Sequence, residues 1–362
     1  SRIMARFEKE RPGFPQAQAS FSASQNFHRF VLSDEIDSVR VITLRRPQAM
    51  NALNDEVTGE ILNVLLKDEN NPDIKGFVIT GYGTQAFSAG ADIGKFPEML
   101  GDKMASVRYA KDCAKVQLHM DSMAKPVVAA LNGLAMGGGL EVAIRCHSLV
   151  AVNNATLQFP EIGLGILPGI GGCVVPYRKW PQGAALFNDM IMLGKPIKTQ
   201  DAADIGMVNQ LVDNPADLIA TAIAEIDRIR TDIPRITEQM VDVPPFEIPD
   251  QPMSGKQGLS LEAVTITTET VEQGAASSSR RVSILSTAAS VPRQISILAA
   301  RSPWVLKKAP WTPCGISGNQ KSAVLWPASK KRDPGSHRLR RHFPLLRIST
   351  ALCSAMRSTV SA

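Results

Sequence analysis

Cysteine is scarce in this sequence, and its five thiols are widely scattered. Cys113, Cys146, Cys173, Cys314 and Cys353 form no Cys-x-x-Cys pair, and no histidine stands near them at a zinc-ligand spacing. This pattern argues against a disulfide framework and against a zinc module. Reduced thiols are the simplest interpretation, and we therefore expect a cytoplasmic protein.

Long apolar runs are also missing. No stretch approaches the roughly 20 apolar residues that cross a membrane, so we expect no membrane span. The first residues, Ser1-Arg2-Ile3-Met4, begin no secretory hydrophobic region. Position 1 is not methionine, which leads us to expect a fragment or an incomplete reading frame.

Acidic residues nearly vanish from the last quarter of the chain. After Glu272 the only acid is Asp333, against 15 Lys and Arg, which gives that segment a net charge of +14. The remaining 25 basic and 33 acidic residues leave −8 for the rest, although the whole chain carries +6. The basic character therefore belongs to the tail alone.

Strand-like and helix-like segments alternate from residue 39 onward, which predicts an α/β core. We expect strands at 39–44, 77–80, 126–131 and 148–152, and helices after a cap at Asn54 or Asp55, at 104–123, 140–145, 217–230 and 260–272. The small-residue segment 86–93 is predicted as a loop, and residues 3–11 as a short helix.

A glycine-rich stretch, Gly133-Leu-Ala-Met-Gly-Gly-Gly-Leu-Glu141, joins a predicted strand to a predicted helix. Glycines let backbone approach a ligand closely, and the first amide N–H groups of a helix lack intrahelical partners. The stretch could therefore hold an anion or a developing oxyanion, with Glu141 near it for proton transfer. The alternative is a tight strand-to-helix crossing that needs glycine only for packing.

Six short motifs, in this order, resemble those of the enoyl-CoA hydratase/isomerase (crotonase) family. They are Arg46-Pro47 with Asn51-Ala52-Leu53, the segment 87–93 (FSAGADI), Lys125–Gly133 (KPVVAALNG), Gly137–Glu141 (GGGLE), Pro160-Glu161, and Pro168–Gly172 (PGIGG). The resemblance covers about residues 28–275. It implies repeated ββα units followed by a C-terminal helical region, and assembly into trimers or hexamers.

The resemblance also implies a set of site residues. The backbone N–H groups of Ala91 and Gly138 would form an oxyanion hole for the thioester enolate, and Glu141 and Glu161 would act on one water. For Glu161 alone, a surface acid after proline is the other interpretation. Contacts to the CoA ester are implied for Gln48, Ala49, Met50, Ala89, Asp92, Ile93, Leu134 and Pro160. Arg46 either pairs a phosphate or is a plain surface arginine.

The implied reaction is reversible syn hydration of a trans-2-enoyl-CoA to a 3-hydroxyacyl-CoA in acyl-CoA degradation. Presence of both glutamates favours a hydratase over an isomerase, which is the alternative. Coenzyme A enters as part of the substrate, and no other cofactor or metal is expected. Cys173 follows the PGIGG motif where the family usually has threonine, and a buried structural thiol is the favoured interpretation.

The resemblance and the composition together divide the chain into four parts. Residues 1–27 would be a linker or the end of an upstream domain, 28–250 the catalytic domain, and 251–275 a partial helical region. Residues 276–362 form a basic tail without a regular period, which we expect to be disordered. It matches nothing in the family, and a shifted reading frame is favoured over a basic extension.

Two further alternatives concern partners. The tail segments 330–332 and 338–342 are basic enough to bind RNA, but unstructured basic sequence is a weak signal and a nucleic-acid partner is not favoured. A fused upstream 3-hydroxyacyl-CoA dehydrogenase would fit the beginning of the chain. No Gly-x-Gly-x-x-Gly motif opens a strand and helix unit here, so dehydrogenase activity is not expected in this piece.

Overall fold

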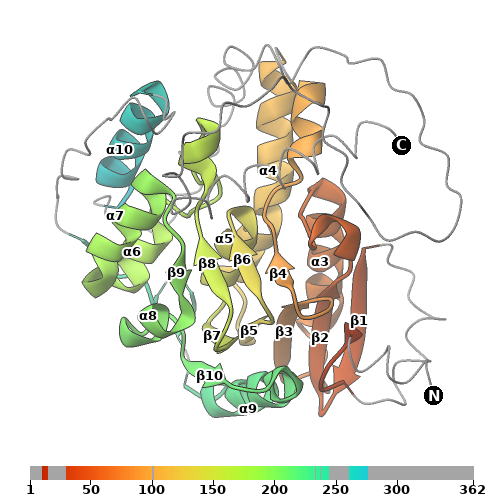
Figure 1. The fold of residues 1–362 in the computed structure, drawn as a ribbon. Coiled ribbons are helices and arrows are strands. Elements are labelled where there is room, and N and C mark those ends of the chain that lie inside the picture. Colours follow the sequence, from red (N-terminus) through yellow and green to blue (C-terminus); the bar gives the residue numbers. More distant parts are fainter. Residues whose placement is uncertain are drawn as a thin grey trace, which may run out of the picture. The chain divides into compact units, whose positions relative to one another are not determined.

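Two β-sheets and the helices around them make up the described chain in this computed structural model (Figure 1). It describes residues 10–14, 30–99, 102–232, 234–236, 238–243 and 261–275, all within the unit Ser1–Arg301. The larger sheet has the order β1-β2-β3-β5-β7-β10 and the smaller β4-β6-β8-β9. The strands are β1 (Val31–Ile36), β2 (Val39–Leu44), β3 (Gly76–Gly81), β4 (Ala86–Ser88), β5 (Val127–Leu131), β6 (Leu134–Met136), β7 (Ser148–Val152), β8 (Thr156–Gln158), β9 (Ile197–Lys198) and β10 (Gln210–Val212).

The central strands of the larger sheet, β3, β5 and β7, are buried at every position, and most of their residues are apolar. Only the β1-β2 hairpin is antiparallel; the other pairs in this sheet run parallel. In β5, Val128 and Ala130 face one hydrophobic cluster while Val127, Ala129 and Leu131 face the other. This double burial is typical of parallel sheets, and it explains why the strands show no polar alternation.

The α-helices are α3 (Asp55–Asp68), α4 (Lys103–Met120), α5 (Gly138–Ile144), α6 (Val175–Lys179), α7 (Ala184–Leu193), α8 (Thr199–Asp204), α9 (Leu218–Ile229) and α10 (Leu261–Ala275). Short 3-10 helices are η1 (Pro47–Ala49), η2 (Ile93–Met99), η3 (Glu161–Leu164), η4 (Pro181–Gly183) and η5 (Pro215–Asp217). Amphipathic α9 packs its apolar face on β3, β5 and β7 (Figure 1).

Strand, strand and helix follow one another four times along the chain. The units are β1-β2-α3, β3-β4-α4, β5-β6-α5 and β7-β8-α6, and in the last three units the first strand joins the larger sheet and the next joins the smaller one. The predicted α/β fold with repeated ββα units is thereby confirmed. In the third unit β6 leads directly into α5, so the first turn of α5 lies at the end of the smaller sheet.

Most of the predicted elements lie where the sequence placed them. Strand β2 has the predicted bounds, and Asn54 is the N-cap of α3, accepting a hydrogen bond from the Val57 amide at 2.9 Å. One expectation was wrong: the segment predicted as a loop at 86–93 contains strand β4, which pairs with β6. The predicted N-terminal helix, residues 15–29 and the tail beyond 275 lie wholly or mostly outside the described residues.

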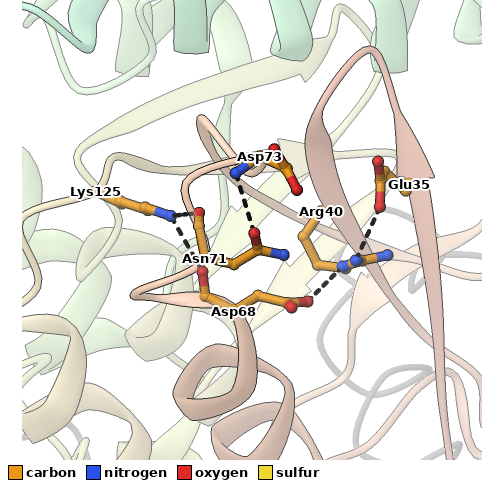
Figure 2. Close-up of polar contacts among 6 residues, drawn as sticks. All are labelled: Glu35, Arg40, Asp68, Asn71, Asp73 and Lys125. Carbon is orange, nitrogen blue, oxygen red and sulfur yellow. Dashed lines mark hydrogen bonds and ion pairs between the residues drawn. The ribbon is translucent and has the colours of Figure 1, made fainter.

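A polar network fixes the C-terminal end of α3 to the start of β5 (Figure 2). The Lys125 ammonium donates to the Asp68 carbonyl at 3.1 Å and to the Asn71 carbonyl, which also accept from the backbone amides of Asn71 and Ile74 where the chain turns after the helix. Arg40 donates from Nε to Asp68 Oδ2 at 2.7 Å and also pairs with Glu35. Lys125, one of the motif residues, therefore has a structural role here.

None of the helices in the described ranges is both long and apolar enough to cross a membrane.

Candidate active site

Glu141 lies on the first turn of α5, where the chain leaves β6. The N-cap, Gly137, has φ +49°, and its amide donates to the Gln158 carbonyl at 2.9 Å, which ties the start of the helix to β8. A Cβ on Gly137 would lie 2.5 Å from Glu161 Oε1. Glycine is therefore required at this position for its backbone conformation and for the space taken by a carboxyl group.

The Glu141 carboxyl group is buried and held by a glycine-rich loop. Its Oε1 accepts hydrogen bonds from the backbone amides of Ile170 at 2.6 Å and Gly172 at 2.9 Å. Both donors belong to the PGIGG motif, which precedes α6. The motif thus positions one oxygen of Glu141 and leaves the other, Oε2, on the side of Gly138.

Glu161 begins η3, directly after β8 and Pro160. It is buried rather than a surface acid, and its Oε2 has no hydrogen-bond partner in the described part of the chain. The same strand that anchors Gly137 therefore delivers the second carboxyl group beside the first turn of α5.

Burial changes the protonation of both acids, but unequally. Burial raises the pKa of Glu141 to about 7, opposed by the amides of Gly172 and Ile170 and by the nearby Arg145 charge. Burial also raises the pKa of Glu161 well above its ordinary value, and the charge of Glu141 acts in the same direction. The pair therefore retains a proton near neutral pH, and Glu161, with fewer stabilising partners, is the residue that keeps it.

Two backbone N–H groups stand free beside the carboxyl groups. Leu53 and Ala91 form an isolated parallel β-bridge. The Leu53 amide donates to the Gly90 carbonyl at 2.7 Å, and the Leu53 carbonyl accepts from the Asp92 amide at 2.6 Å. The Ala91 N–H takes no part in this bridge. Gly138 is the first residue of α5, and its N–H has no intrahelical acceptor. Neither amide donates a hydrogen bond to another described residue.

These two amides lie close to each other. A Cβ built on Gly138 would be 3.4 Å from the Ala91 nitrogen, and one on Gly90 would be 3.1 Å from the Gly138 nitrogen. Gly90 has φ +91°. Two free donors converging on one point can stabilise an oxyanion.

One pocket contains both carboxyl groups and both amides. Its lining residues are Leu53, Thr58, Ala91, Phe96, Tyr109, Ala110, Cys113, Gln117, Gly138, Glu141, Glu161, Ile166, Leu167, Gly169 and Ile170. The four residues that the sequence assigned to chemistry are therefore together. Sequence reasoning missed the wall formed by α4; its signal is the helical spacing of Tyr109, Cys113 and Gln117, four residues apart each time.

The residues predicted to contact the CoA ester do not line this pocket. Gln48 and Ala49 are in η1, Met50 follows them, Ala89, Asp92 and Ile93 flank Ala91, Leu134 begins β6, and Pro160 precedes η3. The Ala89 amide donates to the Met50 carbonyl at 2.9 Å, which holds the first two loops side by side. Their contact with a CoA ester stays a prediction.

Arg46 is not a plain surface arginine, and its pairing with a phosphate stays a prediction. Its side chain is buried, pairs with Asp92 at 2.8 Å and donates to the Ala52 carbonyl at 2.9 Å. It therefore fixes the loop that carries Ala91. Cys173 is fully buried, and burial raises the pKa of its thiol well above the ordinary value, as expected of a structural thiol.

Within the described residues, no group of three or more His, Cys, Asp or Glu side chains could hold a metal ion.

Comparison with known proteins identifies the family. The sequence model of the enoyl-CoA hydratase/isomerase family matches residues 34–270, more than half of the chain. The chain belongs to this family. Its sequence is 36% identical over 204 residues to the short-chain-enoyl-CoA hydratase of Clostridium acetobutylicum, a match covering 56% of this chain and 76% of that protein.

A second sequence relative and a solved structure agree with this family assignment. The crotonyl-CoA hydratase of Syntrophomonas wolfei subsp. wolfei is 34% identical over 191 residues, covering 52% of this chain and 71% of that protein. The crystal structure of an enoyl-CoA hydratase from Rhodobacter sphaeroides 2.4.1 has a TM-score of 0.61 at 22% identity, over 76% of this chain and 90% of that one. At that identity, the structural likeness supports the fold.

Proposed function

We propose that this protein is an enzyme that hydrates a trans-2-enoyl-CoA reversibly to a 3-hydroxyacyl-CoA. The observation that carries the proposal is the pairing of two buried carboxyl groups, both with raised pKa values, beside two free amides in a single pocket. The family and the hydratases named among its relatives support the same reaction.

The thioester carbonyl oxygen is placed between the N–H groups of Ala91 and Gly138. Negative charge develops on this oxygen as the enolate forms, and two preorganised donors stabilise it better than they stabilise the neutral carbonyl. Each such donor can lower the barrier by ~3 kcal/mol. The donors are backbone groups, so the loop of Gly90 and the start of α5 determine their positions.

The two glutamates divide the proton transfers. Ionised Glu141 accepts a proton from water as the water oxygen bonds to Cβ, and protonated Glu161 supplies the proton that bonds to Cα. The proton gained by Glu141 then returns to Glu161, which restores the starting state. Because both carboxyl groups serve the same pocket, we assign the addition as syn; dehydration follows the same steps in reverse.

The proposal needs no cofactor besides the coenzyme A that the substrate carries, because the reaction requires only proton transfers and oxyanion stabilisation. A role in acyl-CoA degradation, a homotrimer or hexamer, a cytoplasmic location and fusion to a dehydrogenase stay predictions. The RNA-binding alternative rests on tail residues outside the described ranges.

The direct test is the loss of crotonyl-CoA absorbance on addition of the purified protein, with the 3-hydroxybutyryl-CoA product identified by mass spectrometry. Hydration that is abolished in a Glu141→Gln, Glu161→Gln double variant would support the proposal. A protein that binds crotonyl-CoA but forms no hydrated product would refute it. Conversion of a trans-3-enoyl-CoA without hydration would instead assign it to the isomerases.

A further inference from the structure

The α4 wall of the pocket, which we define as Tyr109, Cys113 and Gln117, carries polar groups that neither the fold nor the proposed chemistry uses. Gln117 is 1% exposed, and both its Nε2 and its Oε1 lack a hydrogen-bond partner among the described residues. The Tyr109 hydroxyl also lacks one, and its polar neighbour is the Cys113 thiol, a weak partner. All three side chains line the pocket that contains Glu141 and Glu161.

Such groups are unusual at the wall of an apolar cavity. A buried amide without partners destabilises the folded state, so proteins rarely keep one that nothing satisfies. The neighbouring wall residues are apolar, among them Leu53, Phe96 and Leu167, and a plain alkyl chain would contact them well. The same alkyl chain would leave the Gln117 amide unsatisfied.

The charge of the pocket narrows the ligand class. The pocket contains the acids Glu141 and Glu161, and none of its lining residues in the described part of the chain is lysine, arginine or histidine. Burial raises the pKa of Cys113 to about 12 and raises the pKa of Tyr109 well above its ordinary value, so both groups are neutral. A carboxylate on the acyl chain would meet repulsion and no cation, whereas a neutral group that donates and accepts hydrogen bonds would suit the amide of Gln117.

We propose that the preferred substrate is an enoyl-CoA whose acyl chain carries a neutral hydrogen-bonding group, a hydroxyl or a carbonyl, beyond the double bond, and that Gln117 is the residue selecting it. This inference rests on the proposed function for the identity of the thioester. Tyr109 lies two helical turns away on the same face of α4 and provides a second contact for a longer chain.

Binding of saturated ligands tests the preference without relying on turnover. Hexanoyl-CoA, 6-hydroxyhexanoyl-CoA and the CoA monoester of hexanedioic acid are titrated calorimetrically into the full chain. We expect the hydroxy ester to bind at least ~10-fold more tightly than hexanoyl-CoA, and the carboxylate to bind most weakly. Equal affinities, or tighter binding of hexanoyl-CoA, would overturn the proposal.

Gln117→Leu removes the amide at similar volume and should abolish or reverse the preference for the hydroxy ester; Tyr109→Phe should reduce it. Gln200→Leu makes the same change at an exposed position of α8, where Gln200 donates to Asp204 at 2.8 Å, and should leave the preference unaltered. A preference that survives Gln117→Leu would overturn the assignment to this residue. If Gln117→Leu does not fold, Tyr109→Phe decides, and an unchanged preference in it would count against the α4 wall.

The matched trans-2-enoyl esters then separate this inference from the proposed function. Preferential hydration of the 6-hydroxy ester supports both. Preferential binding without hydration of either ester refutes the hydratase and leaves the selectivity standing, while hydration of both at equal kcat/KM refutes the selectivity and leaves the hydratase standing.

Discussion

The glycine-rich side of the pocket and its α4 wall are built on opposite principles. On the glycine-rich side, Glu141 is fixed by two backbone amides, and the free donors of Ala91 and Gly138 follow from the local backbone. On the α4 wall, the buried amide of Gln117 has no hydrogen-bond partner among the described residues, and the Tyr109 hydroxyl has only the weak Cys113 thiol beside it. The first side has the geometry expected of chemistry shared by a family, and the second has side chains free to select a substrate.

The comparison predicts that substitutions on the glycine-rich side change the rate for every substrate, whereas substitutions on the α4 wall change the order of substrates. The former act on the transition state, and the latter on groups remote from the reacting carbons.

The largest loss is expected from Glu141→Gln and Glu161→Gln, each of which should cut turnover of crotonyl-CoA ~10²-fold or more because a proton transfer is lost. Although each variant loses activity, its folded state should be more stable than that of the wild type. Since both folded-state pKa values are raised above the unfolded value of about 4.3, the wild type loses stability as pH rises toward the folded pKa. In each variant the substituted glutamine does not ionise, so this pH-dependent loss of stability is smaller.

Thermal unfolding at pH 5 and pH 8 checks this sign. The melting temperature of each variant should exceed that of the wild type by more at pH 8 than at pH 5. Turnover close to that of the wild type in either variant, or a loss of stability that grows with pH, would contradict the assigned roles. Calorimetric affinity for hexanoyl-CoA should change little, because neither carboxyl group is needed to hold the ester.

A smaller loss, ~10- to 100-fold in kcat, is expected from Gly90→Ala. A Cβ there would lie 2.7 Å from the Met136 carbonyl and 3.1 Å from the Gly138 nitrogen, so the two oxyanion donors must separate. Gly83→Ala is the matched control, since Gly83 also has a left-handed φ of +85° but has open space around it. Equal effects of the two substitutions on kcat would show that backbone strain, rather than donor placement, is responsible.

Much of this organisation could be predicted from the sequence, because short motifs carry the chemistry. The cap at Asn54, the apolar stripe of α9 and the glycines before Glu141 each have a local physical cause. Strand β4 could not be predicted, because three residues are too few to show a period, and its partner β6 begins 46 residues further on.

The parts of the site that escaped prediction depend on contacts distant in sequence. Arg46 pairs with a carboxylate 46 residues away, and the burial of Glu161 depends on the packing of η3 beside Gly137. The polar residues of α4 become meaningful only once that helix is known to line the pocket. Sequence reasoning therefore located the two glutamates and two amides that line the pocket, but not the polar residues of its α4 wall.

A shift in pH dependence, without a large loss of maximal rate, is expected from Arg145→Gln. Arg145 is the buried C-cap residue of α5, and its charge lowers the Glu141 pKa. Loss of that charge raises the pKa of the base, so the acidic limb of the kcat/KM profile should move to higher pH. Arg145→Lys keeps a charge and should shift it less; a limb that does not move in Arg145→Gln would separate Arg145 from the catalytic pair.

The smallest effect on turnover is expected from Asp68→Ala, which acts on the scaffold rather than on the pocket. The substitution leaves the mostly buried Arg40 without its 2.7 Å partner, so it should lower the free energy of unfolding by about 1–3 kcal/mol. Glu35→Ala removes the exposed partner of the same arginine and should cost no more than about 1 kcal/mol. Urea denaturation measures both. The kcat per folded molecule should equal that of the wild type, and a decrease would mean that the α3 network influences the pocket as well as stability.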